Sequence, residues 1–312
     1  NTFNDTISTQ SLGCNRILYG TYTVGGVGAD FVDLAQVLLE LNTCGIAGNV
    51  SFLLQNGIYT ENLDFTHHIP GMTANDTLTF ASLSGNADSV TIVSFDTAVL
   101  FGNVNNIVLH HLSFDLTQGS YAILFKDACE NIEINHCHIK CDTTSTCYAG
   151  IYKEASSGVV HNIRILHNNI EGACYNIYFE GGLNTSEFAN NIIINDNVLS
   201  NAYERGAYLY YSNFNSISNN SIHTRKTNTS SLYYGLSICY SNVSAIHANK
   251  IYSHEPFNEI YGMYVNYVNY YNAVSTGLIS NNEINLQAKS SDAYGMYVNY
   301  SKVNIYHNSI HL

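Results

Sequence analysis

The chain is poor in charge, in proline and in tryptophan. Of its 312 residues 11 are Lys or Arg and 24 are Asp or Glu, with 2 Pro and no Trp, and no cation lies between Arg16 and Lys126. A net charge of −13 with so few cations argues against nucleic-acid binding, which needs clustered Lys and Arg to neutralise phosphates. It also disfavours polyanionic sugars, unless a bound Ca²⁺ bridges the two negative partners. We expect no other cofactor.

Long apolar runs are missing too. No run of about 18 apolar residues occurs, so we expect no membrane-spanning helix. Asn, Ser, Thr and Tyr supply the polarity instead, with 25 Tyr in the chain. A surface of neutral hydrogen-bonding groups and phenol rings suits an extracellular setting and sugar ligands. We therefore expect a secreted or cell-surface protein whose partner is a polysaccharide or another glycan.

A short phrase recurs from about residue 105 onward: an apolar residue, two residues, Asn, one residue and a second apolar residue. The steps from Leu112 to Asn308 average 28 residues (196 residues over seven steps), which suits a coil of three short strands and three turns. We expect the asparagines to stack as a hydrogen-bonded ladder inside the core, each with the left-handed backbone of a tight turn. They are Asn168, Asn197, Asn220, Asn249, Asn282 and Asn308, with Leu112 and Cys137 in the same place in two earlier copies.

A second column supports this register. Each of its glycines is expected to open a strand, and apolar and polar residues then alternate, as in Met263-Tyr264-Val265-Asn266. Alternation of period two indicates a half-buried strand. The repeat predicts an all-β fold, a right-handed parallel β-helix. The glycines are Gly150, Gly206, Gly235, Gly262 and Gly295, with Ala122 and Asn176 in the same place.

The first hundred residues lack the phrase. Apolar residues at helical spacing from Leu34 to Leu41 predict an amphipathic helix capped by Asp30 and closed at Gly45. Strand-like pieces follow at 50–54, 78–80 and 90–93. We expect residues 1–48 to cap a β-helix over residues 49–312, because a solenoid needs its end covered. The C-terminal end shows no such cap, which predicts a continuing chain with further coils or domains, or end-to-end stacking on a partner.

The ladder and the cap resemble the pectin-lyase-like superfamily of right-handed β-helices. Gly57-Ile58-Tyr59-Thr60-Glu61, after the helix, is similar to the G-x-Y-x-E opening of pectin methylesterases. The resemblance covers most of the chain as architecture, and it implies contact with a polysaccharide. The active-site phrases of pectin methylesterases, polygalacturonases and pectate lyases do not occur, so the resemblance implies no particular activity.

One outward column, four residues after the glycine position, carries the candidate catalytic residues. Glu154 and Glu180 follow each other there, with Lys126 before them and Tyr210 after them. Coils stack about 4.8 Å apart, and two carboxylates at that spacing can divide the roles of acid and base in a retaining glycosidase. The alternative is that both point into solvent and splay apart. Lys153, inward by alternation, is a candidate base for β-elimination or marks a local distortion.

Tyrosines flank that column. A row of phenol rings two residues after the glycine position offers apolar area with a polar tip, which suits pyranose rings. Tyrosine is also a common cross-strand stabiliser of an exposed sheet. The candidate sugar-binding residues are Tyr152, Tyr178, Tyr208, Tyr264 and Tyr297, together with Tyr210.

A third column precedes the ladder and begins with His111, His136, His167 and Asp196. It could hold a metal or shuttle protons, but Asn219, Ala248 and Asn281 take the same place later, so polar turn residues explain it as well. We assign no metal ligands.

The cysteines near His136 and His138 do not have zinc-site spacing. If the protein is exported, we expect Cys147 to lie within disulfide reach of Cys141 or Cys174.

Three classes of function remain open. A binding protein needs only the tyrosine row, and a structural or adhesive surface protein needs no site at all. The alternative is a polysaccharide hydrolase or lyase that uses Glu154 and Glu180, or Lys153.

Overall fold

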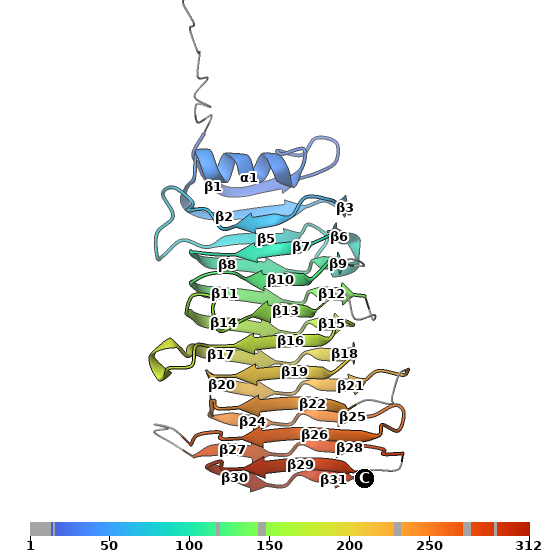
Figure 1. The fold of residues 1–312 in the computed structure, drawn as a ribbon. Coiled ribbons are helices and arrows are strands. Elements are labelled where there is room, and N and C mark those ends of the chain that lie inside the picture. The colour runs from blue at the N-terminus through green and yellow to red at the C-terminus, as the bar shows by residue number, and fades with distance from the viewer. Residues whose placement is uncertain are drawn as a thin grey trace, which may run out of the picture.

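Three parallel sheets form the sides of one solenoid, and equivalent strands of successive coils are hydrogen-bonded in parallel (Figure 1). The computed structural model describes residue 14 and residues 16–116, 119–142, 148–227, 232–270, 276–289 and 292–312. The fold is a right-handed parallel β-helix, which confirms the prediction from the repeat. None of the helices within these residues is long and apolar enough to span a bilayer.

The largest sheet has twelve strands within the described residues. Their order is β1 (Leu18–Val24), β2 (Ile46–Leu54), β5 (Leu78–Ser82), β8 (Val104–His110), β11 (Cys129–Asn135), β14 (Val160–Leu166), β17 (Ala189–Asn195), β20 (Ser212–Ser218), β24 (Ala245–His247), β27 (Gly277–Ser280) and β30 (Val303–Tyr306), with β23 (Asn242–Val243) also paired to β20.

The other two sheets follow the same coils. The ten-stranded sheet contains β3 (Gly57–Tyr59), β6 (Val90–Val93), β9 (Ser113–Leu116), β12 (His138–Cys141), β15 (Asn169–Glu171), β18 (Val198–Ala202), β21 (Ser221–Thr224), β25 (Lys250–Tyr252), β28 (Glu283–Asn285) and β31 (Ser309–His311). The nine-stranded sheet contains β4 (Leu63–Phe65), β7 (Thr97–Phe101), β10 (Tyr121–Phe125), β13 (Ala149–Lys153), β16 (Tyr175–Glu180), β19 (Arg205–Tyr210), β22 (Leu232–Cys239), β26 (Glu259–Asn266) and β29 (Ala293–Asn299). Two short 3₁₀ helices, η1 (Ala87–Ser89) and η2 (Thr185–Glu187), lie in turns.

The asparagine ladder is present at the corner between the twelve- and ten-stranded sheets. Asn220 Oδ1 accepts from the backbone N–H of Asn197 at 3.0 Å, and Asn220 Nδ2 donates to the Ile194 carbonyl at 2.8 Å. The same pattern links all six predicted asparagines, and the Cys137 N–H donates to Asn168 Oδ1 at its upper end. Each amide therefore satisfies buried backbone groups of the coil before it.

The left-handed residue of this turn is the one before the asparagine. His136 has φ 52° and Ala248 has φ 54°. The expectation that the asparagines themselves are left-handed was wrong, because the turn bends one residue earlier and thereby aims the amide into the core.

The glycine column lies inside the strands, so the expectation that each glycine opens a strand was also wrong. Gly262 is the fourth residue of β26. A Cβ there would lie 2.5 Å from the Gly295 carbonyl oxygen and 2.6 Å from Cγ2 of Ile284, the isoleucine two residues after Asn282. The glycines are thus required because that isoleucine of the ten-stranded sheet packs closely against the nine-stranded sheet.

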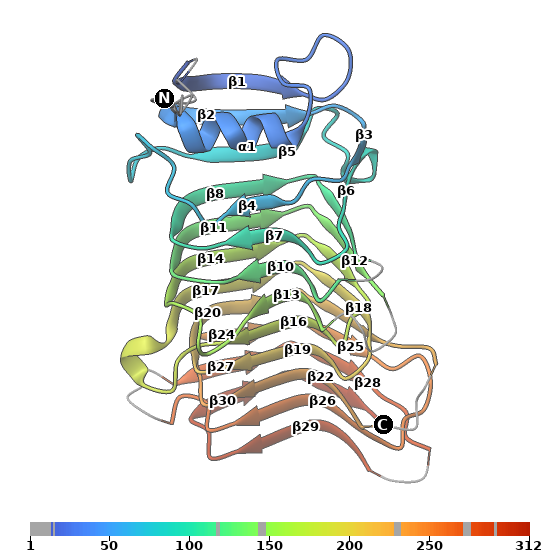
Figure 2. The same cartoon turned by 45° about the horizontal axis from the view of Figure 1, so that its top comes forward.

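The N-terminal end is covered by α1 (Leu34–Thr43), which packs against β1 and β4 and lies across the stack (Figures 1 and 2). The N-cap is Asp33, whose side chain accepts from the Gln36 N–H at 2.8 Å. The prediction of Asp30 as cap was wrong, because only the residue directly before the helix reaches that N–H; Asp30 accepts from Thr23 instead. Gly45, with φ 70°, follows the helix end as predicted.

A disulfide joins Cys14 to Cys44, with a Cα–Cα distance of 4.9 Å, and ties the segment before β1 to the end of α1. Cys147 lies outside the described residues, so its pairing with Cys141 or Cys174 stays a prediction. At the other end, the inward isoleucines of the last coil, Ile305 and Ile310, are 45% and 43% exposed. A continuing chain or a stacked partner there also stays a prediction.

Candidate functional site

The predicted tyrosines gather on the outer surface of the nine-stranded sheet. Tyr152, Tyr178 and Tyr208 are register partners on β13, β16 and β19, with ring centroids 5.0 and 4.5 Å apart along the row. Tyr264 and Tyr297 pair in the same way at 5.0 Å. Tyr210 lies parallel to Tyr208 at 3.9 Å. The structure therefore brings the predicted residues together in two groups, which β22 separates.

A second tyrosine column, which the sequence analysis missed, runs beside the first. In β26 the consecutive residues Gly262 and Met263 are both buried, so the alternation skips one step and Tyr261 returns to the outer surface with Tyr264. The signal in the sequence is the spacing Tyr-x-x-Tyr, which also occurs at 175–178 and 294–297. We call the two columns the tyrosine face: Tyr121, Tyr175, Tyr234, Tyr261 and Tyr294 with Tyr152, Tyr178, Tyr208, Tyr210, Tyr264 and Tyr297.

Several rings of the tyrosine face stack on the equivalent ring of the next coil along the solenoid axis. Tyr178 and Tyr208 have an interplanar angle of 13°, and Tyr264 and Tyr297 one of 2°. In these stacked pairs each ring covers one face of its neighbour. A ligand on this surface consequently meets mainly ring edges and the polar groups between them.

Carboxylates accompany these tyrosines. The Tyr178 hydroxyl donates to Glu180 Oε2 at 2.5 Å, and the Tyr152 hydroxyl donates to Glu154 Oε2 at 3.1 Å. The pattern recurs between Tyr175 and Glu204, Tyr261 and Glu259, and Tyr294 and Asp292.

Burial, reinforced by the neighbouring carboxylate, holds the pKa of Tyr152 and of Tyr178 well above the usual range for a phenol. Burial raises the pKa of Tyr208 to about 12. The hydroxyls of Tyr152, Tyr178 and Tyr208 therefore stay protonated, and the carboxylate oxygens beside them keep unused lone pairs as hydrogen-bond acceptors.

The predicted catalytic residues lie at one edge of this surface. Lys153 and Phe179 are register partners, so Glu154, directly after β13, and Glu180, the last residue of β16, lie on adjacent coils. Each is held by the tyrosine of its own strand, and Glu154 also accepts from Ser156 Oγ at 2.6 Å. Lys126 is exposed after β10, one coil earlier. The structure therefore places the three residues in one column.

Lys153 points inward, as the alternation predicts, and is 1% exposed between Phe125 and Phe179 in the register. Its Nζ donates to the carbonyl oxygens of Glu154 at 2.6 Å and Glu180 at 3.1 Å. Burial lowers the pKa of Lys153 to about 8. The amine is directed at backbone oxygens inside the coil, so it does not reach the outer surface.

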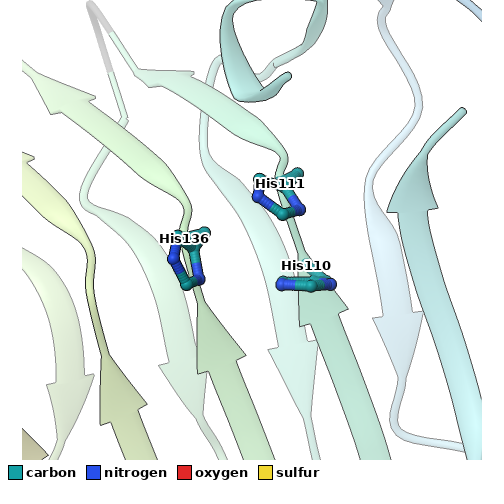
Figure 3. Close-up of side chains that lie close together, drawn as sticks. All are labelled: His110, His111 and His136. Carbon is teal, nitrogen blue, oxygen red and sulfur yellow. The ribbon is translucent and has the colours of Figure 1, made fainter. Parts of the chain in front are cut away.

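Three histidines lie together at the ladder corner, and one ring nitrogen of each lies within 4.8 Å of one ring nitrogen of each of the other two (Figure 3). His110 ends β8, His111 follows it, and His136 occupies the place of His111 in the next coil. His111, His136 and His167 belong to the predicted column, in which Asp196 has the same left-handed backbone. His110 was missed, although a His-His pair followed one coil later by another histidine is visible in the sequence.

A shallow hollow of about 210 Å³ lies over the ten-stranded sheet. Lys140 on β12 has Asp115 of β9 and Glu171 of β15 as its register partners, and all three line the hollow. No recurring phrase in the sequence marks these residues, so spacing along the chain does not reveal them.

No family model matches the chain, and no curated protein matches it. Among solved structures it is similar to the native crystal structure of a GH136 lacto-N-biosidase from Eubacterium ramulus, with 11% identity and a TM-score of 0.50 over 94% of this chain and 68% of that one. The selenomethionine derivative of that protein matches over the same shares with 12% identity and a TM-score of 0.49. Identity this low shows the fold alone, and the class that the fold defines is that of parallel β-helix proteins.

Proposed function

We propose that this protein is a secreted or cell-surface β-helix that binds neutral glycans along the tyrosine face. The observation that carries the proposal is the repeated pairing of a tyrosine hydroxyl with a carboxylate on that surface, as in Tyr178 with Glu180. Sugar hydroxyls are hydrogen-bond donors, and the remaining carboxylate lone pairs accept from them. Ring edges supply apolar contact area for the C–H groups of a pyranose.

The charge and the shape of the surface define the ligand further. Carboxylates line the face and the whole chain carries a net charge of −13, which disfavours an acidic polysaccharide. The two columns follow the coils from β10 to β29, so an extended chain laid along the solenoid axis would meet at least one tyrosine at each coil. A neutral polysaccharide is the ligand that fits both features.

Two further observations support an extracellular protein that contacts carbohydrate. The disulfide between Cys14 and Cys44 is typical of proteins that fold in an oxidising compartment. The GH136 structure with the same fold is named a lacto-N-biosidase, an enzyme of a glycoside hydrolase family. On the sequence resemblance we also propose that the chain belongs to the pectin-lyase-like superfamily.

The test is binding to an array of neutral glycans, followed by calorimetry with the best ligand. The double variant Tyr178→Ala with Tyr208→Ala should weaken binding by about 1–3 kcal/mol, because it removes stacked rings from the centre of the face. Tyr306→Ala, on the exposed end of the twelve-stranded sheet, is the matched control and should leave affinity unchanged. Equal affinity of the parent and the double variant would contradict the proposal. No binding to any glycan would leave a structural or adhesive role.

A polysaccharide hydrolase at Glu154 and Glu180 is the second candidate, favoured by their positions on adjacent coils. Retaining hydrolysis needs carboxyl groups about 5–5.5 Å apart. Hydrolysis of a panel of neutral polysaccharides should fall in Glu154→Gln and in Glu180→Gln if either acts in catalysis. Equal, near-background rates in the parent and both variants would remove this candidate. A lyase that uses Lys153 is not favoured, because its amine is buried against backbone carbonyls.

A further inference from the structure

We propose that His110, His111 and His136 together bind one divalent transition-metal ion, with Zn²⁺ as the reference ion. The three side chains come from two successive coils and converge at the corner after β8 and β11 (Figure 3). The ring centroid of His111 lies 4.0 Å from that of His110 and 4.9 Å from that of His136. This corner is separate from the tyrosine face, so the proposal is independent of glycan binding.

The backbone holds the histidines in place. His111 and His136 are left-handed, with φ of 53° and 52°, and each lies directly before a ladder position. The His111 N–H donates to the Asn135 carbonyl of the next coil at 3.2 Å, which fixes the spacing between the two turns. His110 is the last residue of β8 and is in register with Asn135. The ligand positions are therefore set by the solenoid itself.

A chain of hydrogen bonds orients the ring of His136. Its Nδ1 lies 2.6 Å from Asn135 Oδ1, and Asn135 Nδ2 donates to Glu133 Oε1 at 2.8 Å. Glu133 in turn pairs with Arg164, whose Nε is 3.0 Å from Oε2. Because the amide NH₂ faces the carboxylate, Asn135 Oδ1 can only accept, so His136 Nδ1 carries the proton. Nε2 is left with its lone pair, as in metal sites in which an outer partner fixes the tautomer of a ligand histidine.

The geometry suits an ion with nitrogen ligands. Zn–N bonds of about 2.0–2.1 Å at tetrahedral angles place ligand nitrogens about 3.3–3.4 Å apart. One nitrogen of each histidine already lies within 4.8 Å of the other two, and the half-buried side chains of His110 and His111 can rotate toward the ring of His136 to shorten these separations. Three imidazoles leave a fourth position open for water or another ligand. Mg²⁺ and Ca²⁺ prefer oxygen ligands and are not expected to compete.

The test compares Zn²⁺ binding by calorimetry in the metal-free parent and in variants of the whole chain. His111→Asn with His136→Asn is the informative double variant, because Asn219 and Asn281 already occupy the equivalent left-handed place in other coils. It should keep the melting temperature of the metal-free protein and lose at least tenfold in Zn²⁺ affinity. The matched control is His307→Asn, which alters the same turn position in the last coil and should bind Zn²⁺ like the parent.

Two further measurements separate a built site from scattered surface binding. Asn135→Ala should weaken Zn²⁺ binding by about 10–100-fold, as removal of an outer partner of a ligand histidine does. Co²⁺ should bind one equivalent per chain with visible absorption typical of low coordination number, and the double variant should lose that absorption. Unchanged Zn²⁺ affinity in the double variant, or a parent that prefers Mg²⁺ or Ca²⁺ to Zn²⁺, would overturn the proposal.

Discussion

Replacing Asn220 by alanine should destabilise the protein far more than the same change at Asn308. Asn220 is 1% exposed and stands in the middle of the ladder. Its Oδ1 accepts from the backbone N–H and from the side-chain amide of Asn197, each at 3.0 Å. Its Nδ2 donates to the Ile194 carbonyl at 2.8 Å and to Asn249 Oδ1 at 2.9 Å.

The magnitude follows from which partners are left unsatisfied. The Asn197 amide keeps its bonds to the carbonyls of Ile165 and Asn195, but the Asn197 N–H loses the acceptor that Asn220 provides. A buried donor without a partner costs about 1–3 kcal/mol, and the lost bonds add to this. We therefore expect a loss of about 3–4 kcal/mol. At Asn308, in the half-buried last coil, water can replace the amide, and about 1 kcal/mol is expected.

The assay is urea unfolding followed by circular dichroism, with hydrogen exchange of the Asn197 amide as a local probe. The local probe is needed because a stack of coils can unfold in parts. Asn220→Ala should lower the urea midpoint with an unchanged slope and should speed exchange at Asn197. A free energy of unfolding within about 0.5 kcal/mol of that of the parent, or equal losses at the two positions, would refute the account of the ladder.

Three other changes test the fold. Because Lys153 has a folded pKa of about 8, below its ordinary 10.5, the folded state loses that proton first. Lys153 should therefore add about 1.5 kcal/mol to the stability between pH 8 and pH 9.5, measured as the change in the stability difference between the parent and Lys153→Met in urea unfolding. The comparison with the variant is needed because buried cysteines such as Cys129, whose pKa is raised to about 12, lower the stability of both proteins over this range. Reducing the disulfide between Cys14 and Cys44, which are 30 residues apart, should destabilise the N-terminal end by about 3–4 kcal/mol; a variant with serine at both positions should not respond to reductant. Gly262→Ala should cost about 1–3 kcal/mol in thermal unfolding, because its Cβ would lie 2.5 Å from a backbone oxygen, whereas Gly57→Ala meets nothing within 4 Å and should be neutral.

The amino-acid sequence by itself determined the architecture and the equivalence of residues between coils. The phrase around Asn197 and Asn220 recurs because every coil must bury the same corner, so its period reports the coil length directly. The same equivalence placed Tyr178 beside Tyr208 and Lys153 inside the core. These features depend on spacing along the chain, which the sequence contains in full.

Only the tertiary structure decided where the alternation of inward and outward residues is interrupted and which side chains meet across a turn. Tyr261 shares a surface with Tyr264 because two consecutive residues between them both face inward, and a period of two cannot anticipate such a step. His110 joins His111 and His136 because the left-handed turn rotates the chain between neighbouring residues. The glutamates bind the tyrosines of their own strands, a choice of partner that depends on side-chain positions in space. Backbone rotations at single residues control the first two outcomes, and the packing of side chains against the next coil controls the third.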